Sequence, residues 1–225
     1  VSYSIVNNID KEHIDHYGSL ENLKNNFKKF IQKTPSFGKC FICLDDYING
    51  EVIKEIYTKN FLTFGIDINS NFRINNIKRD KNFSSFDILI TIPGQKNNRI
   101  TNLTIPLLGL HNIRNATAAI AVAYSIGISN KMIKNGLKNF KGVQRRFNKI
   151  FTFNKVNFFD DYAHHPTEIK EVLNGVKKVY SNYEKICIFQ PHRISRLKDL
   201  KSDFASAFED ADKVILCPIY TAGEK

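Results

Sequence analysis

The sequence predicts an α/β protein, because short apolar strands alternate with segments whose apolar residues recur at helical spacing. The alternation is clearest after about residue 150, and this arrangement is typical of a parallel sheet with right-handed crossovers. The 225 residues, 42% hydrophobic and 24% charged, are enough for one large or two modest soluble domains. We expect two α/β domains, residues 1–142 and 143–225, with a boundary near Gly142.

The first domain begins with a strand, a helix and a second strand. Residues 1–9 form a strand that leads into a polar turn, and residues 20–34 show helical spacing that Pro35 stops. Residues 39–44, KCFICL, follow as a strand. Between about residues 61 and 108 the chain consists of short β-rich pieces separated by Asn, Lys and Gly, which predicts hairpins.

Helical spacing returns after this β-rich region. Residues 113–127 combine it with small residues suited to close packing, and Gly127 is placed to end the helix. Residues 130–140 form a second, weaker helix. The order then becomes strand, loop, helix, strand, helix and strand, with the loop at 160–168, the helices at 168–180 and 197–210, and the last two strands at 185–191 and 213–220.

The net charge of +11 and the pI of about 9.4 raise the question of a polyanionic partner. The lysines are scattered among asparagines and isoleucines without a basic stripe, so we expect no nucleic-acid partner. No apolar run approaches the ~20 residues of a membrane span, and no signal peptide opens the sequence. We expect a cytoplasmic protein without a membrane partner.

The cysteines do not form a metal or disulfide pattern. Cys40 and Cys43 make a lone C-x-x-C, while Cys187 and Cys217 stand singly in apolar runs. Because a second pair is missing, buried thiols are favoured over zinc or redox chemistry.

The start of the sequence is also informative. Val1 opens the chain and Met132 is its only methionine. We therefore expect either an internal piece of a longer protein or a processed product.

Two polar loops follow strands in the second half of the chain. In open parallel sheets, ligands bind beyond the carboxyl ends of strands, where residues 160–168 and 190–196 would lie. Arg193 and Arg196 are three residues apart and could grip one anion together with the helix amides. The adjacent His164 and His165 are not expected to share a metal, and the stretch Pro166, Thr167 and Glu168 resembles a helix start.

Two other clusters leave alternatives open. His13 lies among Asp10, Glu12 and Asp15, which predicts either a Mg²⁺ or Mn²⁺ site or a solvated acidic turn. At the start of the helix near residue 113, the side chains of His111, Asn112 and Asn115 could either cap the helix or present amides to a purine edge.

Six stretches in order resemble successive motifs of the Mur ligase family: NNIDKEHIDHY, GLHNIRNATAAIAVA, FKGVQRRF, DDYAHHPTEI, FQPHRISR and YTAGE. The resemblance runs from about Asn8 to Glu224. Family members have a UDP-binding domain, a central ATPase domain with a P-loop, and a Rossmann-like C-terminal domain. The resemblance therefore implies a partial P-loop-type central domain followed by a truncated Rossmann-like domain with a parallel sheet.

The resemblance implies an ATP-dependent amide-bond ligase of peptidoglycan precursor synthesis. It would join L-alanine to UDP-N-acetylmuramate through an acyl phosphate, with ATP and Mg²⁺ (or Mn²⁺). The sequence lacks G-x-x-x-x-G-K-[ST] and the family's metal-binding glutamate, so we expect this chain alone to be inactive. The alternatives are a recycling ligase that attaches a tripeptide, which the QPHRISR loop disfavours, and a non-catalytic fragment that keeps the fold only.

The resemblance also assigns roles to matching positions. His13 would be a ligand of the catalytic metal. The nucleotide ATP would contact His111, Asn112, Asn115, Arg146 and Asp161. The amino-acid and muramate end would be lined by Tyr162, His164, His192, Arg193 and Arg196, with the arginines on the carboxylate of L-alanine. A histidine can accept a proton near neutral pH, and our hypothesis gives His164 that role for the incoming amine.

Overall fold

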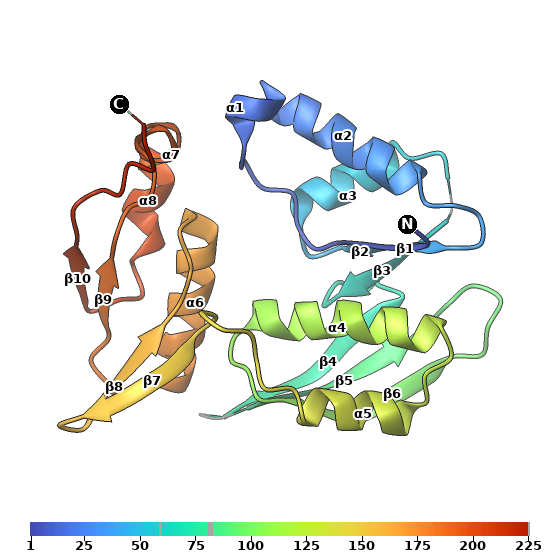
Figure 1. Cartoon of the computed structure of the whole chain (residues 1–225). Coiled ribbons are helices and arrows are strands. Elements are labelled where there is room, and N and C mark those ends of the chain that lie inside the picture. Colours follow the sequence, from blue (N-terminus) through green and yellow to red (C-terminus); the bar gives the residue numbers. More distant parts are fainter. Residues whose placement is uncertain (59, 81–82, 225) are drawn as a thin grey trace. The chain divides into compact units, whose positions relative to one another are not determined.

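The structure is a computed structural model that describes residues 1–58, 60–80 and 83–224, the side chain of Asp15 excepted. The chain divides into two compact units (Figure 1). Unit 1 consists of Val1–Lys78, Ser84–Ile105 and Asn112–Phe140, and unit 2 of Arg79–Phe83, Pro106–His111 and Lys141–Lys225. Both contain helices and strands, so the predicted α/β class is confirmed.

Unit 1 is built on a six-stranded sheet whose strand order follows the chain order. The pairs β1–β2, β2–β3 and β3–β4 are parallel, whereas β5 and β6 pair antiparallel. The strands are β1 (Tyr3–Val6), β2 (Lys39–Cys43), β3 (Phe61–Gly65), β4 (Phe72–Arg79), β5 (Ser84–Ile90) and β6 (Asn98–Ile105).

The hairpins expected between residues 61 and 108 form only in part. The pair β5–β6 is antiparallel, as predicted. The strands β3 and β4 instead run parallel, so a hairpin at this position is wrong. Only the last two residues of β3, Phe64 and Gly65, pair with the first two of β4, Phe72 and Arg73.

Five helices of unit 1 accompany the sheet: α1 (Ile14–Tyr17), α2 (Leu20–Gln32), α3 (Tyr47–Lys54), α4 (Leu110–Ser125) and α5 (Asn130–Lys138). Helix α2 buries Leu23 and Ile31, which lie eight residues apart on one face, against β1, β2 and α3. The sequence did not predict α3, since Gly50 in its middle lowers helix propensity. Asp46 caps α3 by accepting the Asn49 N–H.

The C-terminal part of unit 2 contains a hairpin, β7 (Asn148–Phe153) and β8 (Val156–Asp160), where one strand was expected. Asn154 and Lys155 both have positive φ, as a two-residue hairpin turn with the right twist requires. The rest of the unit comprises α6 (Pro166–Val179), β9 (Ile186–Phe189), α7 (Ile194–Asp199), α8 (Lys201–Ala207) and β10 (Lys213–Leu216), and β9 pairs with β10 in parallel.

The helix predicted at 197–210 is divided into α7 and α8, with Leu200 between them in a non-helical conformation. The core of unit 2 is small and centres on Ile169 and Leu173 of α6, Phe189 of β9 and Ala207 of α8. Among the described residues, no helix is both long and apolar enough to cross a membrane.

Candidate functional site

The site residues predicted from the sequence lie in unit 2, except Asn112, Asn115 and the cluster around His13, which lie in unit 1. In unit 2 they gather around the loop that joins β8 to α6.

Asp161 ties this loop to the segment that precedes β7. One carboxylate oxygen accepts the Ala163 N–H at 2.7 Å, and the other accepts the Phe147 N–H at 2.8 Å. Burial raises the pKa of the Asp161 carboxyl, while these two hydrogen bonds and the charges of Arg146 and His111 act against the rise. Each oxygen has a second lone pair, so the carboxylate could still accept a bond from a sugar hydroxyl.

The segment Arg145 to Phe147 has a backbone conformation that residues other than glycine rarely adopt. Arg145 has a φ of 57° and Phe147 a φ of 51°, both in the left-handed region. The Tyr162 N–H donates to the Arg145 carbonyl at 2.9 Å, and the Arg145 guanidinium lies 4.6 Å from the centre of the Tyr162 ring. These contacts, with those of Asp161, hold the strained segment in place.

The ring of His164 is oriented by hydrogen bonding. Its Nδ1 lies 2.9 Å from the Tyr162 carbonyl oxygen and 3.5 Å from a Glu168 carboxylate oxygen. Both neighbours are acceptors, so Nδ1 carries the proton in the neutral ring. Nε2 is then the nitrogen that can take up a second proton.

A row of aromatic rings continues from this histidine. The centre of the His164 ring lies 5.3 Å from that of Tyr162 and 6.3 Å from that of His192, and His192 lies 5.1 Å from Tyr220. Burial lowers the pKa of His192, and the basic side chains around it lower it further. In decreasing order of effect these are Arg196, His164 and Arg193, while Glu224 acts in the opposite direction.

The loop at residues 190–196, which carries Arg193 and Arg196, is closed by a contact that the sequence did not predict. The Glu224 carboxylate accepts the Ser195 N–H at 2.9 Å and the Ser195 hydroxyl at 2.7 Å. This amide of α7, expected to help bind an anion, therefore already has a partner in the chain. Arg193 has a φ of 70°, and Arg196 donates from Nη1 to the His192 carbonyl at 3.2 Å.

His165 is explained by the structure as a helix cap. It is buried at the N-cap position of α6, where its ring Nδ1 accepts the Thr167 N–H at 3.4 Å. Pro166 occupies the first turn, and the Glu168 side chain completes a capping box by accepting the His165 N–H. The helix start predicted from these residues is confirmed.

In unit 1, the N-terminal part of α4 carries Asn112 and Asn115. Asn7, just beyond β1, donates from Nδ2 to the Asn115 Oδ1 at 3.1 Å. Asn49, fully buried in α3, donates in turn to the Asn7 carbonyl at 3.2 Å and to the Cys43 carbonyl at 2.9 Å. The end of the parallel sheet thereby fixes the side chain of Asn115.

The same end of α4 is anchored by an ion pair that sequence reasoning missed. The Arg114 Nε lies 2.7 Å from an Asp45 carboxylate oxygen, and Asp45 also accepts the Ile66 and Asp67 amides. Gly65 has a φ of 146°, and a Cβ there would lie 2.5 Å from the Asp45 Oδ1. No sequence signal marked this pair, because its partners are 69 residues apart.

His13 lies at the start of α1 in a left-handed conformation with a φ of 57°. Its side chain is 62% exposed and its Nε2 is 4.0 Å from a Glu12 carboxylate oxygen. Within residues 1–58, 60–80 and 83–224, no group of three or more His, Cys, Asp and Glu side chains could hold a metal ion. Asp15, a member of the predicted cluster, has its side chain outside the described part.

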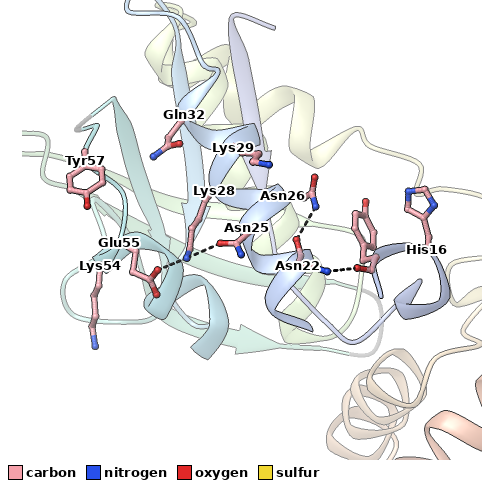
Figure 2. A pocket seen from close by; sticks show the side chains of 11 residues that line it. His16, Asn22, Asn25, Asn26, Lys28, Lys29, Gln32, Lys54, Glu55 and Tyr57 are labelled. Atoms are coloured by element: carbon pink, nitrogen blue, oxygen red, sulfur yellow. Dashed lines mark hydrogen bonds and ion pairs between the residues drawn. The ribbon is translucent and has the colours of Figure 1, made fainter. Parts of the chain in front are cut away.

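A hollow of about 920 Å³ in unit 1 is lined by side chains of α1, α2 and α3 and by Glu55 and Tyr57 (Figure 2). Its polar groups bond to one another: Lys28 contacts Glu55 and Asn25, and the Asn22 amide donates to the Tyr17 carbonyl at 3.0 Å. None of the described residues that line it belongs to the predicted site.

Comparison with known families gives two matches that together cover most of the chain. The model of the Mur ligase middle domain matches residues 1–123, and that of the Mur ligase glutamate ligase domain matches residues 145–225.

Individual proteins are similar over nearly the whole chain. UDP-N-acetylmuramate–L-alanine ligase of Pelagibacter ubique is 63% identical over 224 residues, which cover 100% of this chain and 48% of the relative. The enzyme of the same name from Bartonella tribocorum is 41% identical over 99% of this chain and 47% of its own length. The chain therefore spans about half the length of the curated relatives it matches.

A solved structure also resembles the chain. The crystal structure of UDP-N-acetylmuramate-alanine ligase MurC from Thermotoga maritima superimposes with a TM-score of 0.72 at 26% identity. The match covers 97% of this chain and 46% of that one.

Proposed function

The chain belongs to the Mur ligase family, and from that premise we propose that it forms part of an ATP-dependent ligase that joins L-alanine to UDP-N-acetylmuramate. The observation that carries the proposal is the 63% identity, over 224 residues, to a ligase of that name. We place the reaction in the cytoplasm, in peptidoglycan precursor synthesis, with small-molecule substrates and no nucleic-acid or membrane partner.

The chemistry follows from the substrates. The muramate carboxylate attacks the γ-phosphorus of ATP, and the bond from that phosphorus to the bridging oxygen of ADP breaks. The amine of L-alanine then attacks the acyl phosphate, phosphate leaves, and the amine nitrogen loses a proton. Such reactions depend on positioned cations for the phosphoryl group and on an acceptor for the proton.

His164 is the proton acceptor in this proposal. Its Nδ1–H is directed at the Tyr162 carbonyl and the Glu168 carboxylate, so Nε2 is the basic atom. The neighbouring His192 has a lowered pKa, which leaves it uncharged at neutral pH and avoids repulsion of a second positive ring. Arg193 and Arg196 would hold the carboxylate of L-alanine.

The residues assigned to ATP have groups that fit a nucleotide. Asn7 donates to the Asn115 Oδ1, so the Asn115 Nδ2 is the group left to donate to a purine nitrogen. In unit 2, Asp161 keeps acceptor capacity for a ribose hydroxyl, and Arg146 offers a cation for phosphate. His111 and Asn112 complete the proposed set.

The described residues offer fewer groups for the metal than for ATP. We propose Mg²⁺ (or Mn²⁺), with His13 as one ligand, because its imidazole is exposed and preceded by acidic residues. The described side chains do not by themselves complete a coordination sphere, so the steps above rest on protein groups alone.

The test uses a chimera in which this chain replaces the matching 224-residue half of the Pelagibacter ligase. We expect ADP release that requires both UDP-N-acetylmuramate and L-alanine, within about tenfold of the parent rate, since every proposed contact is retained. The parent enzyme is the positive control. Release with a tripeptide and not with alanine would indicate the recycling ligase, and no release with either would refute both.

A further inference from the structure

The Glu168 carboxylate joins three segments of unit 2. It extends from the first turn of α6 toward the loop that carries His164 and toward Arg146 in the strained segment before β7. The sequence marked it only as part of a helix start.

Its two oxygens have different partners. Oε2 accepts the backbone N–H of His164 at 2.9 Å and that of His165 at 3.3 Å, and the same oxygen is 3.5 Å from the His164 Nδ1. Oε1 lies 3.5 Å from the Arg146 Nη1. A helix cap needs only the backbone bond to His165, so the contacts to the His164 ring and to Arg146 require another explanation.

The charge state of Glu168 suits an electrostatic role. Burial acts to raise its pKa, but the backbone N–H of His164, the His164 ring, the backbone N–H of His165 and the Arg146 guanidinium outweigh it and lower the pKa of this carboxyl. Because its pKa lies below the ordinary value, a carboxylate, and not a neutral acid, faces the imidazole at neutral pH.

We propose that Glu168 is a positioning residue for the amide-forming step. Its carboxylate holds the Nδ1 edge of His164, so that Nε2 faces the amine, and it balances the positive charge that the ring acquires when Nε2 takes the proton. It also keeps Arg146 beside the same loop. The proposal rests on the proposed function, because it assigns Glu168 through the role of His164.

The first test needs no activity. Carbon-13 NMR titration of Glu168 in the 225-residue chain should show the carboxyl titrating at higher pH in His164→Gln than in the wild type, because one group that lowers its pKa is removed. Glu171→Gln removes a charge one turn along α6 but keeps the contact between Glu168 and the His164 ring, so it should leave the Glu168 titration close to wild type. An unchanged titration in His164→Gln would overturn the pairing.

The second test is a double-mutant cycle in the chimera. Glu168→Gln keeps an oxygen that can accept the cap bonds, so its unfolding midpoint should stay near wild type. Its kcat should fall about tenfold to a hundredfold while the KM for L-alanine changes less than about twofold. In a His164→Gln background the same change should cost less than about twofold, because the ring through which it acts is gone.

The outcomes separate the two proposals. An equal loss of kcat in both backgrounds would mean that Glu168 only supports the fold, and would overturn its positioning role. Glu171→Gln should keep the kcat of the chimera. If the chimera releases no ADP at all, the proposed function fails, and the Glu168 titration then decides separately whether the carboxylate and the imidazole interact.

Discussion

The strands of unit 1 and unit 2 have similar apolar sequences but differ in burial. Phe41 of β2 and Phe64 of β3 have no exposed surface, whereas Phe151 of β7 keeps 51% and Leu216 of β10 keeps 66%. In unit 1, β2 and β3 each have a strand on both sides, while unit 2 holds two two-stranded sheets. Apolar sequence is thus enough for strand formation, but burial depends on the layers that neighbouring elements supply.

The acidic side chains of the two units also differ, in their burial and in what they contact. In unit 1, Asp45 and Asp87 are well buried and their carboxylates bond to arginines and backbone amides that join distant elements. In unit 2, Asp161 and Glu168 are only half-buried and lie beside the histidine loop. The buried acids of unit 1 therefore hold its architecture, whereas the half-buried acids of unit 2 hold a candidate site.

The largest effect should come from removing a buried ring of unit 1. Phe64→Ala should lower the free energy of unfolding by about 3–5 kcal/mol, because a fully buried ring leaves a cavity. Phe151→Ala in unit 2 is the matched control and should cost about 1 kcal/mol or less, mainly the stacking on Phe158. Urea unfolding of both variants measures the contrast, and equal losses would contradict it.

A smaller effect is expected from the buried acid Asp87. Its carboxylate accepts bonds from Asn76 at 2.8 Å, Arg99 at 2.6 Å and the Asn102 N–H at 2.8 Å. Asp87→Asn should cost about 1–3 kcal/mol at pH 7. The exposed Asp203→Asn in unit 2 should change stability by about 0.5 kcal/mol or less.

This loss should depend on pH. Burial opposes ionisation of Asp87, but the hydrogen bonds from Asn76, the Asn102 N–H and Arg99 outweigh it, so the folded pKa lies below the ordinary value of 3.8. The ionised carboxylate therefore contributes stability above pH 3.8 and loses it as the pH falls through the lowered pKa. The gap between wild type and Asp87→Asn in urea unfolding should shrink below that pH, and a constant gap would exclude a role for the charge.

The smallest effect is expected from removing a helix N-cap, which can be done in each unit. His165→Ala removes the cap of α6, and Ser19→Ala removes the cap of α2, whose hydroxyl accepts the Asn22 N–H at 3.1 Å. Each should cost about 1 kcal/mol. His165 is also buried, so its loss should be the larger by thermal unfolding. A larger loss of stability for Ser19→Ala would show that the burial of His165 adds little to the stability of unit 2.

Much of the fold could be predicted from local patterns. The strand at 39–44, the helix at 20–34 and the helix start at Pro166 depend on spacing, propensity and stop signals within a few residues. The predictions failed where local signals were weak. Helix α3 contains Gly50, and the parallel β3–β4 pair has only two paired positions.

The candidate site was predicted as a set of residues but not as an arrangement. The motif order along the chain identified His164 and Asp161, yet it could not show that Asp161 accepts amides on both sides of the hairpin, or that Glu168 contacts the His164 ring. Partners such as Asn7 and Asn115 are 108 residues apart, beyond any local pattern.

The α/β class, most of the secondary structure and the family motifs could be predicted from the sequence, because each depends on residues close together in the chain. The folded structure was needed to show which strands are buried, that His165 caps a helix, and which ring nitrogen of His164 is the basic one. These properties depend on contacts between distant segments, since burial and hydrogen-bond partners exist only once the chain has folded.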